Sequence, residues 1–344
     1  MMKSKLIMCR PFFSIIIATY NSEKTLEYSL KSIREQNFNQ DDIEILVVDG
    51  GSSDTTLSIA QKYGAKIFHN QKRLPEYAKL IGDEKATGYY ALRLDSDEEF
   101  ISKNQLADKK DFLLKHDEIK VMIENLKEPG RSDICGISAA YLNILGDPFS
   151  YFIYNTKEDK CTTYQKYITF SDGKYNILRF NDDDMPPLAD SGGSLYSLDY
   201  IRTKYPDKYN TIEFTCGIYD RLIRDTGICG CIKGDNVKHN CKSDFKTYLR
   251  KLKFRVINNI FHKEESGFSS RANSSKNSSK KLLGFLLYAV IVPLPILDSF
   301  RLAIKYKNIT FILHVVYLYY VCYEIFISYL FKFWGLKRYN NQYG

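Results

Sequence analysis

Two aspartates separated by one residue are the side chains in this chain most able to do chemistry. Asp95 and Asp97 follow an apolar run, residues 89–94, that predicts a buried strand. Carboxylate oxygens at a strand end can hold a hard divalent cation, which can in turn hold a diphosphate. The motif Asp-x-Asp is frequent by chance and is often a pair of solvated loop residues. It therefore indicates a metal site only if the preceding sequence places it at a suitable strand end.

Alternating strands and helices are predicted over the first hundred residues. The predicted strands are 13–18, 43–48, 65–68 and 89–94, and the helices between them begin near Ser22, at Thr55 and at Glu76. This order indicates a parallel sheet with right-handed crossovers, in which ligands bind beyond the carboxyl ends of the strands. The segment 19–21, Asp49 and the segment 95–97 all follow such ends, so one crevice can hold all three.

The middle of the chain has a weaker pattern. We expect a helix over 108–126, strands over 134–145, 164–170 and 195–198, an acidic turn over 181–187 and a small-residue loop over 190–194. A helix over 218–225 should end at Gly227, which suits the position after a helix C-terminus.

Beyond His239 the sequence becomes basic and then strongly apolar. Apolar side chains recur at helical spacing over 245–260, with Lys246, Arg250 and Lys253 on the other faces. Two interpretations stay open for this amphipathic helix: it lies in a membrane interface, or it packs on the rest of the protein. Residues 266–281 read as a polar linker.

Two apolar segments follow the linker. Residues 282–297 are only a minimal span and contain Pro293 and Pro295, whereas 309–331 are long enough to cross a bilayer. We expect the two segments to form a membrane hairpin rather than buried core helices. A re-entrant or in-plane element is the alternative for the first segment. The predicted division is a catalytic domain over 1–240, a juxtamembrane helix and linker over 241–281, and a hairpin with tail over 282–344.

Charge and cysteine content bound the remaining classes. The net charge is +8, with most of the basic excess after Lys233. The first eight residues are too short and polar for a secretory signal, so we expect the catalytic domain to lie in the cytoplasm. We expect the protein itself to be located at the cell membrane. No nucleic-acid partner is expected, and the sequence indicates no oligomeric state. Among the 8 cysteines, Cys229, Cys231 and Cys241 with His239 could suggest zinc, but ordinary reduced thiols fit their spacing better.

The residues 13–22, 47–56 and 94–97 resemble the successive motifs of family 2 glycosyltransferases with the GT-A fold. Lys79, Gly82, Ala86 and Gly88 fit a further family pattern, with Lys79 where the family has Arg. Residues 192–193, 219–220 and 237–239 resemble the acceptor half more loosely. The resemblance implies an α/β protein with a Rossmann-like, mostly parallel sheet flanked by helices, followed here by the amphipathic helix and membrane helices.

That resemblance also implies a nucleotide-diphosphate-sugar donor and Mn2+ or Mg2+. The implied roles are these: Thr19, Tyr20 and Asn21 border the nucleoside, Asp49 accepts a hydrogen bond from the base, Lys79 approaches the diphosphate, Asp95 and Ser96 contact the donor, and Asp97 with Asp95 and His239 holds the metal. Asp49 could instead be a loop acid that caps a helix, and His239 could be structural.

An inverting transfer is implied as well, with Asp220 as the catalytic base. The family has Glu before this Asp, whereas Tyr219 stands here, so Asp190 and the acids 182–184 are rivals. The expected acceptor is a glycan carried on a polyprenyl phosphate or diphosphate in the membrane. One alternative is a polyprenyl-phosphate monosaccharide synthase. Another is a catalytically silent membrane scaffold that binds nucleotide sugars, which is supported by Tyr219 in place of Glu and Lys79 in place of Arg.

Overall fold

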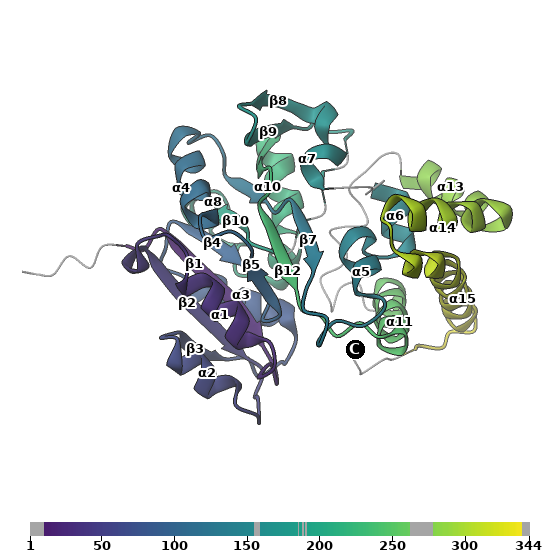
Figure 1. Cartoon of the computed structure of the whole chain (residues 1–344), viewed down its shortest axis with the longest axis horizontal. Helices are drawn as coiled ribbons and strands as arrows, with labels where there is room; N and C mark the ends of the chain where they lie inside the picture. The colour runs from purple at the N-terminus through teal and green to yellow at the C-terminus, as the bar shows by residue number, and fades with distance from the viewer. Residues whose placement is uncertain are drawn as a thin grey trace, which may run out of the picture.

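A large twisted sheet and a group of C-terminal helices make up the molecule (Figure 1). The computed structural model describes residues 10–154, 159–184, 186–187, 189, 191–261 and 278–338. The strands of the large sheet are β1 (Phe13–Thr19), β2 (Ile43–Asp49), β3 (Lys66–His69), β4 (Tyr90–Arg93), β6 (Val121–Ile123), β8 (Ile168–Ser171), β9 (Tyr175–Arg179), β10 (Ser194–Ser197) and β11 (Ile228–Ile232). Their spatial order is β3-β2-β1-β4-β10-β6-β11-β9-β8.

The first four strands confirm the predicted parallel arrangement. Strand β1 pairs in parallel with β2 and β4, and β2 pairs in parallel with β3. Residues of β1 and β2 are buried on both faces, as continuous apolar runs in parallel strands should be. The expectation of a mostly parallel sheet holds only in part beyond β4: β10 runs antiparallel to both β4 and β6, and β9 runs antiparallel to both β11 and β8, whereas β6 and β11 pair in parallel. The sheet is therefore mixed.

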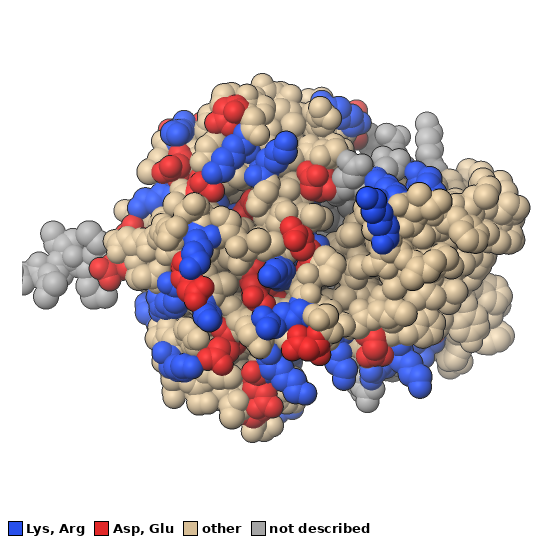
Figure 2. Space-filling model, viewed as in Figure 1, with Lys and Arg blue, Asp and Glu red and all other residues tan. Residues whose placement is uncertain are grey.

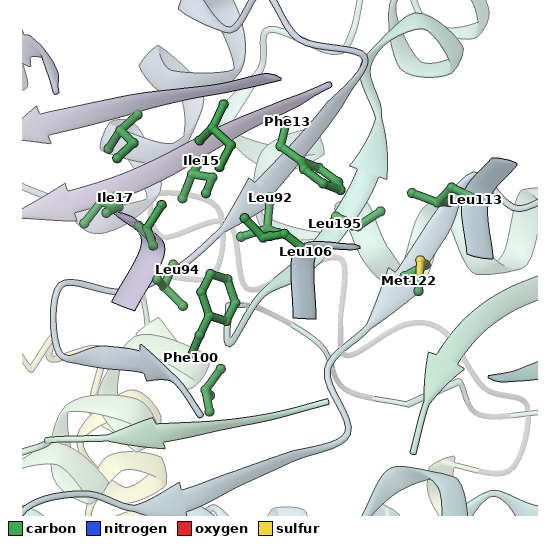
Figure 3. Packing of buried hydrophobic residues seen from close by; sticks show 14 of the residues in the cluster. Phe13, Ile15, Ile17, Leu92, Leu94, Phe100, Leu106, Leu113, Met122 and Leu195 are labelled. Atoms are coloured by element: carbon green, nitrogen blue, oxygen red, sulfur yellow. The ribbon is translucent and has the colours of Figure 1, made fainter. Parts of the chain in front are cut away.

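Helices cover both faces of the parallel half. The helices here are α1 (Leu26–Arg34), α2 (Thr56–Lys62), α3 (Pro75–Lys85), α4 (Gln105–Lys115), α8 (Leu198–Lys204), α9 (Ile212–Cys216) and α10 (Ile218–Thr226). Alternate residues of β1 face opposite ways, so Ile15 and Ile17 join the cluster in Figure 3 that holds the buried face of α1, whereas Ile16 contacts α3 at Gly82. This two-sided packing fixes where the strand ends, and thus the site, must lie.

Gly82 allows α3 to approach β1 closely. A Cβ built at this position would lie 2.3 Å from Ile16 Cγ2. We therefore expect Gly82→Ala to lower the free energy of unfolding by about 1–3 kcal/mol in urea titrations. In an Ile16→Ala background the same change should cost little, because the obstructing methyl group is gone and Ala favours helices. An equal loss in both backgrounds would contradict this account of the glycine.

Two expectations for the middle of the chain are corrected. The helix predicted over 108–126 is α4, which ends at Lys115, and β6 and β7 (Leu126–Pro129) occupy the remainder. The strand predicted over 134–145 is instead helix α5 (Ala139–Leu145), whose apolar residues pack on one side against other helices. Strands predicted at 164–170 and 195–198 correspond to β8 and β10 with shifted ends, and α10 ends as expected at Gly227, where φ is 71°.

A second, three-stranded sheet stands beside the first. It consists of β5 (Glu98–Phe100), β12 (Asn236–His239) and β7, in the order β5-β12-β7. Its pairing sets His239 opposite Glu98, one residue beyond Asp97. The small sheet therefore carries residues from the distant 236–239 segment to the end of β4.

The C-terminal helices share a core with two helices from the middle of the chain. The elements of this region are α5, α6 (Pro148–Tyr154), α11 (Phe245–Phe261), α13 (Ser278–Val290), α14 (Pro293–Lys305), a 3-10 turn (Ile309–Leu313) and α15 (His314–Phe333). Tyr141, Tyr248 and Tyr317 meet in its centre. The amphipathic helix is thus present as α11 and packs through Tyr248 and Leu252, while Lys246 and Arg250 are exposed. The division of the chain at 240 and 281 stays a prediction.

By length and composition, one helical stretch in the described parts of the chain could cross a membrane, Ile309–Phe333. Leu283–Val290 and Pro293–Lys305 would count as a second only as one broken span, since they are bent by 91°. The remaining elements are the short helix α7 (Lys160–Thr163) and 3-10 turns at Gln40–Asp42 and Gln165–Tyr167.

Candidate active site

Three strand ends meet at one edge of the large sheet. Thr19 and Asp49 are register partners at the ends of β1 and β2, and the Thr19 hydroxyl donates to Asp49 Oδ1 at 2.9 Å. The loop after β4 joins them, because the hydroxyls of Ser22 and Ser96 are 3.0 Å apart. The three segments singled out in the sequence therefore lie together, as the parallel topology predicts.

Asp49 organises the loop that follows β2. Its carboxylate accepts hydrogen bonds from the Ser52 hydroxyl at 2.5 Å and from the backbone N–H groups of Gly51 and Ser52 at 2.8 Å each. Burial alone would raise the pKa of Asp49, but these hydrogen bonds outweigh burial and lower the pKa. The carboxylate thus ties together the loop after β2, but its partners Gly51 and Ser52 precede α2, which begins at Thr56, so it does not cap that helix. Its contact with a base stays a prediction.

An exposed aromatic ring lies beside this loop. Tyr20 is 50% exposed, and the guanidinium of Arg73 lies 5.7 Å from its ring centroid. Both Asn21 and Arg73 have positive φ, 48° and 57°, and such strain collects at functional sites. Asn21 is held in place by accepting from the Ser53 N–H at 2.9 Å. No feature of the sequence marks Arg73, whose position depends on the path of the loop after β3.

Lys79 lies on α3, on the face that packs against the sheet, and is only 8% exposed. A lysine this far buried is costly unless its charge is compensated. Its predicted approach to a diphosphate stays a prediction.

Asp97 and His239 form an ion pair. His239 Nε2 lies 3.4 Å from Asp97 Oδ2, and its Nδ1 lies 2.7 Å from Asn143 Oδ1. Burial would lower the pKa of His239, yet the Asp97 carboxylate outweighs burial and raises it to about 10. Conversely, burial would raise the pKa of Asp97, but the charge of His239 lowers it to about 2. The sequence-predicted proximity of these two residues is therefore present, with the imidazole as a cation.

The predicted metal ligands fit a divalent cation only in part. Asp95 and Asp97 are half-buried carboxylates at the open edge, and Mg2+-type sites use one or two carboxylates together with substrate phosphates. Within the described ranges, no three or more His, Cys, Asp or Glu side chains are arranged to hold a metal ion. The predicted trio of ligands is thus not assembled: Asp97 faces His239, whereas Asp95 is bonded elsewhere. The residues fit a cation held jointly by Asp97 and a diphosphate.

Asp95 belongs to a polar network that the sequence did not indicate. The Ser191 hydroxyl donates to Asp95 Oδ2 at 2.8 Å, and Lys127 Nζ lies 2.8 Å from the Ser191 hydroxyl and 2.6 Å from Glu98 Oε1. Glu98 is fully buried and also accepts from the N–H groups of Asp95 and Gly192, at 2.8 and 2.7 Å. The network ties the loop after β4 to the loop before β10.

Lys127 is the charge that allows this network to be buried. Burial lowers the pKa of Lys127, but the carboxylates of Glu98, Asp95 and Glu124 together raise it above its ordinary value. Gly192 makes room for the lysine, since it has a φ of 74° and a Cβ there would lie 2.9 Å from Glu124 Cγ. Gly192 was noted in the sequence, whereas Lys127, Glu98 and Glu124 carry no local motif.

Asp220 lies on the first turn of α10. Its carboxylate accepts from Arg224 Nε at 3.1 Å, one helical turn later. The preceding Tyr219 is buried, donates its hydroxyl to the Ser194 carbonyl at 3.1 Å and packs edge-on against Tyr196. The start of α10 is therefore next to β10, whose N-terminal end borders the site. The role of Asp220 as a base stays a prediction.

The alternative candidates for the base and for a zinc site lie in separate places. Asp190 lies outside the described residues, and Asp184 accepts from the Tyr167 hydroxyl at 3.1 Å. Cys229 and Cys231 are buried in β11, with the sulfur of Cys231 3.0 Å from that of Cys161. Cys241 is close to His239 instead, where the imidazolium helps to lower the pKa of its thiol against the opposing effect of burial. The structure thus separates the cysteines that the zinc alternative grouped.

The part of the chain that forms this edge of the sheet is similar to known proteins. The family described as Glycosyl transferase family 2 matches residues 14–107. Poly(ribitol-phosphate) beta-N-acetylglucosaminyltransferase TarS of Staphylococcus aureus strain Mu50 is 34% identical over 125 residues, which are 35% of this chain and 22% of that protein. GalNAc(5)-diNAcBac-PP-undecaprenol beta-1,3-glucosyltransferase of Campylobacter jejuni is 38% identical over 99 residues, 27% of this chain and 31% of that protein.

The fold is also found in a solved structure. The mannosyltransferase PcManGT from Pyrobaculum calidifontis, in complex with GDP-Man and Mn2+, superposes with a TM-score of 0.51 at 14% identity, over 92% of this chain and 87% of that one. This likeness concerns the fold alone, and the chain spans less than a third of the length of the two relatives above. The chain thus has a GT-A-like mixed α/β fold, and its residues 14–107 match glycosyltransferase family 2.

Proposed function

We propose that this protein is a metal-dependent, inverting glycosyltransferase that moves a sugar from a nucleotide-diphosphate donor to a membrane-associated acceptor. The observation that carries the proposal is the meeting of Thr19, Asp49 and the 95–97 loop at one edge of the sheet, with Asp97 paired to a charged histidine. That edge lies at the carboxyl ends of parallel strands, where α/β folds bind ligands.

The donor would lie across the strand ends. Tyr20 and Asn21 border the nucleoside, with the Asp49 loop closing one side and the exposed Tyr20 ring offering a stacking surface. Lys79 and the His239 imidazolium supply positive charge for the diphosphate. Lys127 holds Asp95 through Ser191, so that the Asp95–Ser96–Asp97 loop keeps one conformation.

The reaction needs stabilisation of the leaving group. Breaking the sugar–phosphate bond develops negative charge on the departing diphosphate, and fixed positive charges lower that barrier. Asp97 would hold Mn2+ or Mg2+ with the diphosphate, and the chemistry that such a cation supplies when bound is neutralisation of this charge. Asp220 is the proposed base for a hydroxyl acceptor, and an acceptor that is itself a lipid phosphate would need no strong base.

A lipid-linked acceptor at the cell membrane, with the catalytic domain on the cytoplasmic side, is part of the proposal. Its support is the apolar C-terminal helices together with the names of relatives that act on undecaprenol-linked and dolichyl-linked substrates. The relative named for poly(ribitol-phosphate) makes a polymer of that kind the competing acceptor. Transfer assays with both acceptor types distinguish the two.

The donor can be identified by thermal unfolding. With Mn2+ present, we expect one nucleotide sugar in a panel to raise the melting temperature by about 2–5 °C at saturating concentration, because it binds only the folded state. The effect should shrink when EDTA replaces Mn2+. A panel in which no nucleotide sugar or free nucleotide diphosphate shifts the transition would contradict the proposed donor site.

A further inference from the structure

The helices α13, α14 and α15 present a continuous apolar surface to the outside. In Figure 2 the end of the molecule that these helices form in Figure 1 is almost free of acidic and basic side chains, whereas the sheet half carries many. We call this surface the apolar face. Its exposed members are Leu283, Leu286, Leu287, Val290, Ile291, Val292, Leu294, Leu297, Phe300, Ile304, Val316, Tyr319, Tyr323, Phe326 and Phe333.

The outward residues follow helical spacing, so the exposure is systematic. On α13 they recur at Leu283, Leu286, Leu287 and Val290, while Phe285 and Ala289 on the other side are buried against neighbouring helices. Helix α13 therefore has one apolar side that packs inward and a second that faces out. Soluble proteins rarely expose a contiguous apolar patch of this extent, which marks a partner or a membrane.

The bend between α13 and α14 prevents either arm from crossing a bilayer. The arms Leu283–Val290 and Pro293–Lys305 meet at 91°. At 1.5 Å per residue they are about 12 and 20 Å long, shorter than the ~30 Å hydrocarbon core. The vertex is apolar and strongly exposed, with Val290 at 76%, and its backbone is satisfied internally: the N–H of Ile291 donates to Leu287 O at 3.0 Å and that of Leu294 to Ile291 O at 2.8 Å. A vertex of this kind can enter hydrocarbon without unpaired N–H groups.

Basic residues border the apolar face. Lys281 precedes the exposed residues of α13, Lys305 is the last residue of α14, and Lys307 follows that helix. The sequence contains no acid between Asp298 and Glu324. Lysines at the rim of an apolar surface suit anionic lipid headgroups. Basic side chains without intervening acids match an anionic lipid surface, which is therefore the partner we argue for.

The segment that follows α15 folds back along this helix, which argues against a simple crossing of the membrane by α15. After Gly335 the chain turns back, and Arg338 pairs with Glu324 at 2.9 Å and donates to the Ser328 hydroxyl at 2.8 Å. Arg338 therefore lies level with the middle of α15, about 13 Å before its end by helical rise. At the other end, buried His314 is 2.5 Å from the Tyr141 hydroxyl of α5. A helix that crossed would draw the 336–338 segment, with its backbone, into the hydrocarbon.

We propose that the apolar face enters a single leaflet of an anionic bilayer from one side, with α13–α14 as a re-entrant pair, α15 along the interface and no segment that crosses. This deepens the proposed membrane association and rests on it, but it requires no catalytic activity. It places Lys307, between α14 and α15, on the same side of the membrane as the active site.

Vesicle flotation tests the face itself. Full-length protein should float with vesicles of phosphatidylcholine and phosphatidylglycerol, and Val290→Glu with Leu297→Glu should lower the bound fraction at least about tenfold, because carboxylates would enter hydrocarbon. The matched control is Leu114→Glu with Ile137→Glu, two exposed apolar residues on other surfaces (67% and 53%), which should float as wild type does. Unchanged flotation of the first variant, or wild-type protein that forms soluble dimers and ignores vesicles, would overturn the proposal.

Side-specific labelling tests the topology. Lys307→Cys and, as a reference on the sheet half, Lys103→Cys are both at exposed positions. A membrane-impermeant maleimide should label both from the same side of sealed membrane vesicles, above the background of wild-type protein. Labelling of the two from opposite sides would show that α13–α14 crosses as one span of a hairpin, and the proposal would be wrong. Both readouts are independent of sugar transfer, so a failure of the catalytic proposal leaves them interpretable.

Discussion

Asp97→Asn should abolish sugar transfer while leaving part of the donor affinity. The substitution keeps the size of the side chain but removes the charge that pairs with His239 at 3.4 Å and would hold a divalent cation. Loss of charge stabilisation at a leaving diphosphate costs several kcal/mol of barrier, so we expect at least about a 100-fold fall in kcat. Donor binding should persist in part, since the Asp49 loop and Tyr20 are untouched.

The variant needs a control with the same change of charge. Glu35→Gln removes an exposed carboxylate that pairs with Lys31 at 3.7 Å at the C-terminal end of α1, the opposite end of this helix from the loop after β1. Its kcat should match wild type within about twofold, as is usual for surface ion pairs. If Asp97→Asn retained wild-type kcat under the same conditions, Asp97 would not have the role proposed for it.

Lys127→Met should strongly destabilise the fold. The change leaves Glu98, which is fully buried, and half-buried Asp95 without the cation that compensates them. Breaking a buried pair by removing one partner costs about 3–5 kcal/mol, which urea unfolding would measure. Because the Asp95 loop depends on the same lysine, donor affinity should fall as well.

Two further variants separate the buried pair from a general effect of removing a lysine. Lys174→Met breaks an exposed pair with Asp108 and should cost less than about 1 kcal/mol. Adding Glu98→Gln to Lys127→Met should recover part of the stability, since the uncompensated charge is then gone. Equal losses for Lys127→Met and Lys174→Met would show that the network is not a stabilising element.

The sequence predicted the parallel half of the fold well because periodicity reports burial directly. Runs such as 13–18 and 43–48 are apolar at all but one position each, Ser14 and Glu44, as expected of a strand covered on both faces. Once four strands are parallel, their carboxyl ends must share an edge, so the meeting of Thr19, Asp49 and the 95–97 loop follows from topology. The prediction of a strand over 134–145 was wrong because a short apolar run fits a buried strand and a buried helix alike.

The electrostatic part of the site could not be predicted in the same way. Lys127 on β7 and Glu98 on β5 are brought together by the three-stranded sheet, and Ser191 reaches them from the loop before β10. The antiparallel insertion of β10 carries Gly192 to Glu98, and no local pattern announces it. His239 was found because a motif pointed to it, whereas its ionised state depends on the nearby Asp97 in the folded protein.

The most direct test of the central claim is transfer of a radiolabelled sugar from the donor found by thermal unfolding to a polyprenyl-diphosphate-linked acceptor in vesicles. Wild-type protein with Mn2+ should form a labelled lipid product, and both EDTA and Asp97→Asn should suppress it at least about 100-fold. Wild-type protein that binds the donor yet yields neither transfer nor hydrolysis with lipid-linked and soluble acceptors would contradict the account.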